Sequence, residues 1–173
     1  MQIIKIIDEK YPKRLLEIND PPKILYVEGD MNLLNNDSIA IVGSRKSTEY
    51  GRKYAKKFAE ELSKNNVTII SGLAIGIDSI AHEYSKSNLG KTIAVLGCGL
   101  DYVYPQENIL LYKQILKNGG CIISEYPLGT KADTKKFPKR NRIISGLSIG
   151  VLVVEASLKS GSTITGRLRL NAR

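Results

Sequence analysis

Apolar residues in this chain gather in short, nearly continuous runs separated by mixed stretches. Five such runs are Ser38–Gly43, Val67–Gly72, Thr92–Gly97, Cys121–Glu125 and Ile149–Glu155. An unbroken apolar run of this length is typical of a strand buried on both faces of a parallel sheet. The first three runs end in glycine, where a strand can turn sharply into the next element. The pattern therefore predicts five parallel strands.

The segments between these runs repeat their apolar residues every three or four positions, as amphipathic helices do. We expect helices over Tyr50–Asn65, Gly76–Lys86, Gln106–Asn118 and Ser160–Arg173. In the first helix Tyr54, Phe58 and Leu62 share one face, which the pattern makes its apolar face. Alternating strands and helices predict an α/β fold, doubly wound, with a mostly parallel sheet, helices on both faces and right-handed crossovers.

The first 37 residues follow a different pattern. Prolines at 12, 21 and 22 interrupt them, and Lys23–Glu28 is predicted as an extra strand. We expect residues 1–37 to form an N-terminal extension packed on a core of residues 38–173. Residues 130–139 are expected to form one long polar loop.

Length and composition set aside several classes of protein. The chain has 173 residues, 42% of them apolar, which suits one globular domain. No apolar run approaches the ~20 residues of a membrane span, and Met1–Ile7 is too short for a signal-peptide core. Two distant cysteines and a single histidine predict no metal site. We therefore expect a cytoplasmic protein that does not enter a membrane.

Charge changes this picture, because it is concentrated in the last quarter of the chain. The net charge is +9, and residues 131–173 hold 10 basic and 2 acidic side chains. An excess of this kind indicates either an anionic partner, nucleic acid first, or a solvated basic face that maintains solubility. Charge alone does not separate the two.

The ends of the predicted strands mark the candidate site, because ligands of an open α/β sheet bind outside the carboxyl ends of its strands. Gly43, Ser44 and Arg45 follow the first strand, where a helix N-terminus can bind an anion. Ser160, Gly161 and Ser162 open another helix in the same way. The hydroxyls of Ser44, Thr48 and Ser162 can equally serve as helix caps, whereas Arg45 has no capping role.

No nucleotide cofactor is expected. The Walker A spacing does not occur, and neither Gly43-Ser44-Arg45 nor Gly97-Cys98-Gly99 continues into the dinucleotide-binding pattern.

The densest basic cluster follows the polar stretch and is predicted to lie in a loop before the last strand. It consists of Phe137, Lys139, Arg140, Asn141 and Arg142, with Pro138 among them. A base stacked on Phe137, with phosphates on the arginines, is a common arrangement for single strands. The alternative is that Phe137 is a hydrophobic plug for the loop, and one ring can do both.

No catalytic set is predicted. His82 follows Asp78 by one helical turn, but no nucleophile accompanies them, so a helix-capping Asp78 bonded to a packed His82 is favoured. Asp101 and Glu155 are acids that could face the site or orient loop backbone and arginines.

These motifs together resemble the DNA-processing protein A family, over about Tyr11 to Leu170. The ordered landmarks are Ile41–Arg45, Tyr50–Gly51, Ile70–Ala74, Gly76–Asp78, Ala81–His82, Thr92–Gly97, Gly99–Asp101, Tyr104–Pro105, Asn108, Ser124–Pro127, Phe137–Leu147, Val154–Ala156 and Ser160–Ser162.

The resemblance implies a Rossmann-like domain that binds single-stranded DNA without catalysis and loads RecA recombinase on incoming DNA during natural transformation, as a homodimer. It assigns the DNA pocket to Gly43, Ser44, Arg45, Phe137, Arg140, Asn141 and Arg142. Relative to the family, the chain is expected to be truncated after its last helix. The alternative hypothesis is a phosphoribohydrolase-like enzyme that cleaves nucleoside monophosphates, whose glycine-rich motif would fall near Ser160–Thr165 but is not matched there.

Overall fold

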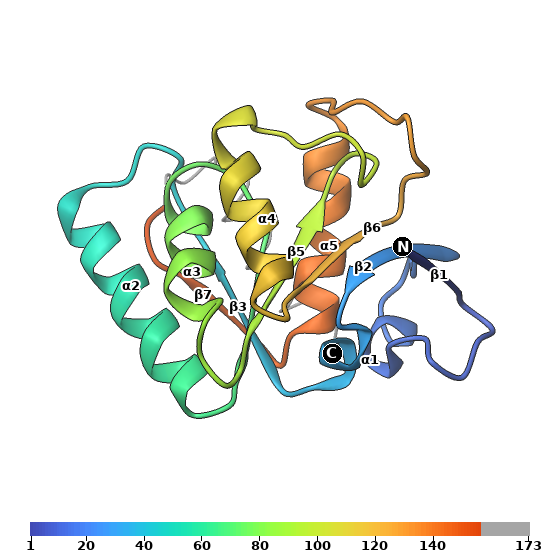
Figure 1. Cartoon of the computed structure of the whole chain (residues 1–173), viewed down its shortest axis with the longest axis horizontal. Helices are drawn as coiled ribbons and strands as arrows, with labels where there is room; N and C mark the ends of the chain where they lie inside the picture. Colours follow the sequence, from blue (N-terminus) through green and yellow to red (C-terminus); the bar gives the residue numbers. More distant parts are fainter. Residues whose placement is uncertain (157–173) are drawn as a thin grey trace.

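A computed structural model describes residues 1–156. Within them, seven strands form one sheet in the order β1-β2-β6-β5-β4-β3-β7 (Figure 1). The strands are β1 (Gln2–Lys5), β2 (Ile24–Gly29), β3 (Ser38–Val42), β4 (Thr68–Ser71), β5 (Thr92–Leu96), β6 (Cys121–Ser124) and β7 (Gly150–Val153). Strands β3 to β7 pair in parallel, and β1 and β2 are antiparallel to their neighbours. The five predicted parallel strands are confirmed.

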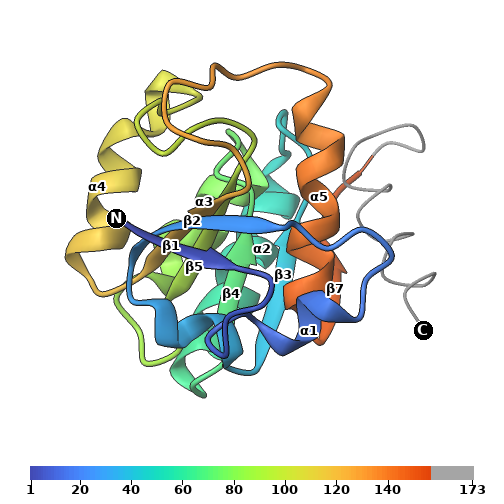
Figure 2. The same ribbon diagram turned by 90° about the vertical axis from the view of Figure 1, so that its right-hand side faces the viewer.

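Helices cover both faces of this sheet. They are α1 (Lys13–Leu16), α2 (Glu49–Lys64), α3 (Ile77–Ser85), α4 (Ile109–Lys117) and α5 (Lys136–Leu147), with 3-10 turns η1 (Met31–Asn35) and η2 (Gln106–Asn108). Helices α2, α3 and α4 lie on one face, and α5 and α1 lie on the other (Figures 1 and 2). The doubly wound α/β class is therefore confirmed. None of the helices within residues 1–156 is long and apolar enough to cross a bilayer.

Strand order reverses beside β3. From β3 the chain winds outward through β4 and β5 to β6, and it then returns to place β7 on the other side of β3. Crevices of open α/β sheets form at such a reversal, outside the carboxyl ends of the strands. The loop after β3 carries Arg45, so the topology places this residue beside the expected crevice.

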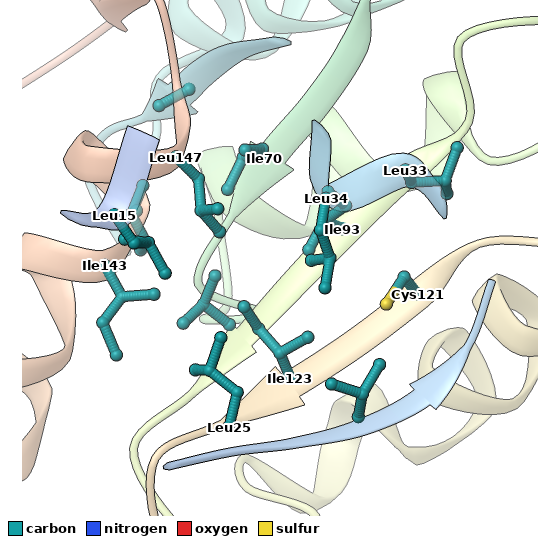
Figure 3. Close-up of a cluster of buried hydrophobic side chains, with 14 of the residues drawn as sticks. Leu15, Leu25, Leu33, Leu34, Ile70, Ile93, Cys121, Ile123, Ile143 and Leu147 are labelled. Carbon is teal, nitrogen blue, oxygen red and sulfur yellow. The ribbon is translucent and has the colours of Figure 1, made fainter. Parts of the chain in front are cut away.

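The core has one layer on each face of the sheet. Figure 3 shows the layer beneath α5, where Ile70, Ile93 and Ile123 of the sheet pack with Ile143 and Leu147 of the helix. Residues that alternate with these along the strands point to the other face. There they pack in two clusters under α2, α3 and α4. Burial on both faces explains why the strands appear in the sequence as unbroken apolar runs.

Residues 1–37 add to the same sheet. β2 pairs with β6, so that Val27 lies opposite Ile123, and β1 pairs with β2. The buried Tyr11 hydroxyl donates to the Pro22 carbonyl oxygen at 2.7 Å, and this bond links two parts of the N-terminal segment. The strand predicted over Lys23–Glu28 is confirmed as β2, and β1 was not predicted.

The expected loop around Phe137 is wrong in part, because α5 begins at Lys136. Pro138 is the third residue of this helix, where a backbone nitrogen has no acceptor within the helix and proline is tolerated. Gly146 lets the helix approach α1, since a Cβ there would come within 2.9 Å of Leu15. The basic cluster is therefore carried on a rigid helix.

The face that α2 buries also differs from the pattern. Its buried residues are Gly51, Ala55, Ala59 and Ser63, and these small side chains allow close packing with α3 and β3. Tyr54 is half-buried, and Phe58 is 40% exposed. The aromatic residues share a face as expected, but that face is a flank of the helix and not its core side.

Candidate nucleic-acid interface

A cavity of about 260 Å³ opens outside the carboxyl ends of β3, β4 and β5, beside the point where the strand order reverses. This is below the usual size of a drug-binding pocket and suits one flat ring system such as a nucleobase. Three loops, the turn η2 and the start of α5 contribute to its wall. The lining residues are Arg45, Gly72, Ala74, Ile75, Tyr104, Pro105, Gln106, Glu107, Phe137 and Arg140.

Phe137 joins three parts of this wall. Its ring stacks on Tyr104 with 5.5 Å between centroids and 22° between planes. The guanidinium carbon of Arg45 lies 5.6 Å from the Phe137 centroid, within the range of a cation–π contact. A Cβ on Gly97 would come within 2.9 Å of the Phe137 ring, so glycine is required beneath it. The ring therefore anchors the start of α5 and also faces the cavity.

Arg45 is exposed on a loop that is held in several places. The Ser44 carbonyl accepts from the Ile77 backbone N–H at 3.2 Å, and the Ser44 hydroxyl accepts from the Lys46 N–H at 3.1 Å. Thr48 caps α2 by accepting from the Gly51 N–H at 3.1 Å, which confirms the capping interpretation for Thr48. The Arg45 guanidinium thus projects from a fixed backbone.

Glu155 orients this loop as well. Its carboxylate accepts from the Thr48 backbone N–H at 3.0 Å and from the Thr48 hydroxyl at 3.2 Å. Asp101 has a comparable role on another loop, where it accepts from the Gly129 N–H at 2.9 Å. Both acids therefore orient loop backbone, one of the two alternatives that the sequence left open.

Arg140 is buried, with 5% of its surface exposed, although a DNA contact was predicted for it. Its Nη1 donates to the Gly72 carbonyl at 2.8 Å and also to the Val95 carbonyl, and its Nε donates to Asn141 Oδ1 at 3.2 Å. The guanidinium links the ends of β4 and β5. Only one edge of the Arg140 side chain reaches the cavity wall.

Asp78 supplies the compensating charge below Arg140. Its carboxylate accepts from the backbone N–H groups of Gly72 at 3.1 Å and Ala74 at 3.4 Å, and both of those residues line the cavity. Burial raises the pKa of Asp78, and the positive charge of Arg140 opposes that rise. Burial lowers the pKa of Arg140, and Asp78 opposes that change in turn. The two charges stabilise each other and fix the floor of the cavity.

Arg142 is not brought to the cavity. Its guanidinium makes two hydrogen bonds to Glu125, at 2.9 and 2.7 Å, and a third to Asp20 at 3.1 Å. Only 14% of the Arg142 side chain and 9% of the Glu125 side chain are exposed. This arginine therefore links α5 to the end of β6 and to the N-terminal segment.

The remaining predicted residues have distinct placements. Lys139 is exposed on α5, Asn141 is buried behind Arg140, and Gly43 packs under Ile77. Ser160, Gly161, Ser162 and the helix predicted around them lie outside the described residues.

The histidine is part of the core. His82 Nδ1 lies 2.8 Å from Thr92 Oγ1, and burial lowers the pKa of His82 to about 3. Asp78 accepts from the backbone of the loop before α3, so the predicted packing of His82 is confirmed, whereas the predicted helix-capping role of Asp78 and its bond to His82 are wrong. Across residues 1–156, no cluster of acids, histidines and cysteines could hold a metal ion.

Sequence reasoning missed one wall of the cavity. Tyr104, Gln106 and Glu107 line it from the segment that follows β5. The expectation that ligands bind beyond strand ends applies equally to this segment. However, its cavity-lining residues lie several positions beyond the end of β5, and for this reason they were not predicted.

The sequence matches the profile of the DNA recombination-mediator protein A family over residues 2–173. The chain belongs to this family. It is 46% identical to the protein Smf of Escherichia coli K12 over 168 residues, which are 97% of this chain and 45% of the relative. The chain thus spans about half the length of that relative.

Two solved structures share the fold closely. DNA processing protein A (DprA) of Streptococcus pneumoniae superposes with a TM-score of 0.93 at 41% identity, over 99% of this chain and 60% of that one. DprA of Helicobacter pylori was solved in a study of its single-stranded DNA binding mode. It superposes with a TM-score of 0.87 at 36% identity, over 99% of this chain and 78% of that one. The resemblance inferred from the motifs is confirmed.

Proposed function

We propose that this chain binds single-stranded DNA by holding a base in the cavity against Phe137 while Arg45 contacts the adjacent phosphate. The observation that carries the proposal is the Arg45–Phe137–Tyr104 arrangement, which combines a cation and stacked rings at the mouth of a base-sized cavity. Aromatic rings beside basic groups are the usual means of binding single strands. The single-stranded DNA binding of the Helicobacter pylori relative supports single-stranded DNA as the ligand.

In this proposal the predicted residues divide by role. Arg45, Phe137 and the exposed Lys139 contact DNA, while Arg140 and Asn141 shape the cavity. Gly43 and Ser44 provide the backbone of the Arg45 loop. Ser160, Gly161 and Ser162 are proposed as a further DNA contact from the chain that follows β7.

The wider role is also a proposal. We propose that the chain loads RecA recombinase on incoming DNA in natural transformation, as a homodimer in the cytoplasm, and membership of a recombination-mediator family supports the mediator part of this role. On this view the protein acts by binding and carries out no chemical step.

Fluorescence anisotropy with labelled oligo-dT tests the DNA-binding proposal. We expect Kd to rise with salt, with a log–log slope of about 0.7 for each phosphate contacted. Arg45→Glu should weaken binding strongly, whereas Lys5→Glu, on β1 and outside the cavity lining, should not. Binding that is insensitive to both salt and Arg45→Glu would refute the proposed site.

Two further measurements address the wider role. A pull-down with RecA and the molecular mass in solution test the partner and the homodimer. Release of free base from nucleoside monophosphates would instead support the phosphoribohydrolase-like alternative.

A further inference from the structure

Helix α2 carries three aromatic side chains that lie outside its buried face. Tyr50, Tyr54 and Phe58 follow one another at a spacing of four and form what we call the aromatic stripe. Ring centroids are 4.5 Å apart for Tyr50 and Tyr54, and 6.4 Å apart for Tyr54 and Phe58. Tyr50 is 68% exposed and Phe58 is 40% exposed. So much exposed aromatic surface on one helix indicates a binding partner.

Packing of the helix does not account for the stripe. The buried face of α2 consists of Gly51, Ala55, Ala59 and Ser63. None of the stripe residues belongs to the hydrophobic clusters of the described chain or to the apolar residues packed against them. The stripe therefore flanks the packed face and is open to a ligand.

The charge around the stripe indicates the kind of ligand. Between Tyr50 and Phe58 the helix carries four cations and no acid: Arg52, Lys53, Lys56 and Lys57. All four cationic residues are exposed, including Lys56, whose Nζ lies 4.4 Å from the centroid of Tyr84. Aromatic rings with interleaved cations match an unpaired nucleic acid strand, which offers bases for stacking and phosphates for ion pairing. Glu49 lies one turn before Lys53 and Glu61 one turn after Lys57, but cations outnumber acids along the stripe, and this excess favours an anionic ligand.

The stripe is also continuous with the cavity. The loop that carries Arg45 runs directly into α2, and Thr48 caps the helix two residues before Tyr50. Eight residues of helix place Phe58 roughly 12 Å beyond Tyr50. At about 3.4 Å per nucleotide of a stacked strand, this length accommodates roughly three or four nucleotides.

We propose that single-stranded nucleic acid leaving the cavity continues along α2, with bases stacked on Tyr50, Tyr54 and Phe58 and phosphates on Lys53 and Lys57. This proposal rests on the proposed function, because the cavity starts the path. It adds a second contact region that lengthens the binding site.

Anisotropy with dT2, which is too short to reach along the stripe, and with dT20 tests the extension. The double variant Tyr50→Ala/Phe58→Ala should bind dT2 as the parent does and should bind dT20 at least 5-fold more weakly, since each base–aromatic stack contributes at least this factor. Leu110→Ala is the matched control, because it removes a 68% exposed apolar side chain from α4. Lys53→Gln/Lys57→Gln should lower the dT20 salt slope by about 0.7 for each phosphate that the variant no longer binds.

Several results would overturn the extension. Unchanged dT20 affinity would do so, as would equal weakening of dT2 and dT20, since the variant would then act through the cavity. A change in molecular mass on removing the stripe would assign it to self-association. If the parent binds neither oligonucleotide, or if Arg45→Glu has no effect, the proposed function fails and the extension fails with it. Circular dichroism melting confirms that each variant is folded.

Discussion

The Arg45 guanidinium lies over the ring of Phe137, with 5.6 Å between its central carbon and the ring centroid. The two residues are nevertheless far apart in the sequence. Arg45 follows β3, the first parallel strand, and Phe137 is the second residue of α5, which precedes β7. Their contact closes one side of the cavity. A ligand that displaces Arg45 from the ring would gain both a cation and an aromatic face.

Phe137→Leu separates the packing of this ring from its stacking. Leucine keeps apolar contact with Gly97 and Tyr104 but has no π-face. We expect DNA affinity to fall by about 1–3 kcal/mol, while the melting temperature changes little. Anisotropy and thermal melting measure the two effects, with Tyr26→Leu on β2 as a control at a half-buried ring outside the cavity. Unchanged affinity would show that Phe137 only plugs the helix end.

Arg140→Gln tests whether this arginine holds the cavity together. The change leaves the Gly72 and Val95 carbonyls without their donor and Asp78 without its counter-charge. We expect a loss of about 3–5 kcal/mol in the free energy of unfolding, measured by urea denaturation. A variant that keeps full stability and loses only DNA affinity would instead make Arg140 a direct phosphate ligand.

Arg142→Gln should act on stability through Glu125. Removing the two hydrogen bonds to that carboxylate is expected to cost about 2 kcal/mol, since hydrogen bonds to charged groups exceed neutral ones. A double-mutant cycle with Glu125→Gln isolates the pair, and the double variant should lose less stability than the sum of the single variants. Strictly additive losses, or a larger effect on DNA affinity than on stability, would contradict this role.

Stability should decrease with acidification because of His82. Burial lowers the pKa of His82 to about 3 in the folded state, whereas an unfolded histidine titrates near 6.5. Between these values the unfolded chain binds a proton that the folded chain does not, so this contribution to stability is lost as pH falls below about 6.5. The slope approaches about 1.4 kcal/mol per pH unit. Urea denaturation at pH 7, 6 and 5 measures it, and His82→Gln should reduce the slope.

The sequence predicted the parallel strands because their burial on both faces leaves a continuous apolar run. The prediction from the sequence failed for α5, because a proline followed by three basic residues is typical of a loop. Pro138 is compatible with a helix only because it lies in the first turn of α5. The prediction also misplaced the core of α2, where Gly51, Ala55 and Ala59 carry too little hydrophobicity to stand out beside Tyr54 and Phe58. Small residues that permit close packing leave a weak signal in an apolar pattern.

The site was predictable where it depends on strand ends and not where it depends on distant partners. Arg45 follows β3 directly, so topology alone placed it. The burial of Arg140 against the carbonyls of Gly72 and Val95, and the pairing of Arg142 with Glu125, arise from contacts between remote parts of the chain. Nothing in the local sequence distinguishes these arginines from Arg45.

The attachment of the Arg45 loop to the rest of the fold affects how fast a ligand can bind. Three hydrogen bonds fix the loop backbone. The Ile77 N–H donates to the Ser44 carbonyl, Arg52 donates to the Ser47 carbonyl, and the Thr48 N–H donates to the Glu155 carboxylate. A strand that arrives here meets a loop that is already ordered, so little conformational entropy is lost on binding. Association should therefore require no rearrangement of the loop backbone, and its rate should be governed by diffusion and by electrostatic attraction to exposed cations such as Arg45 and Lys139.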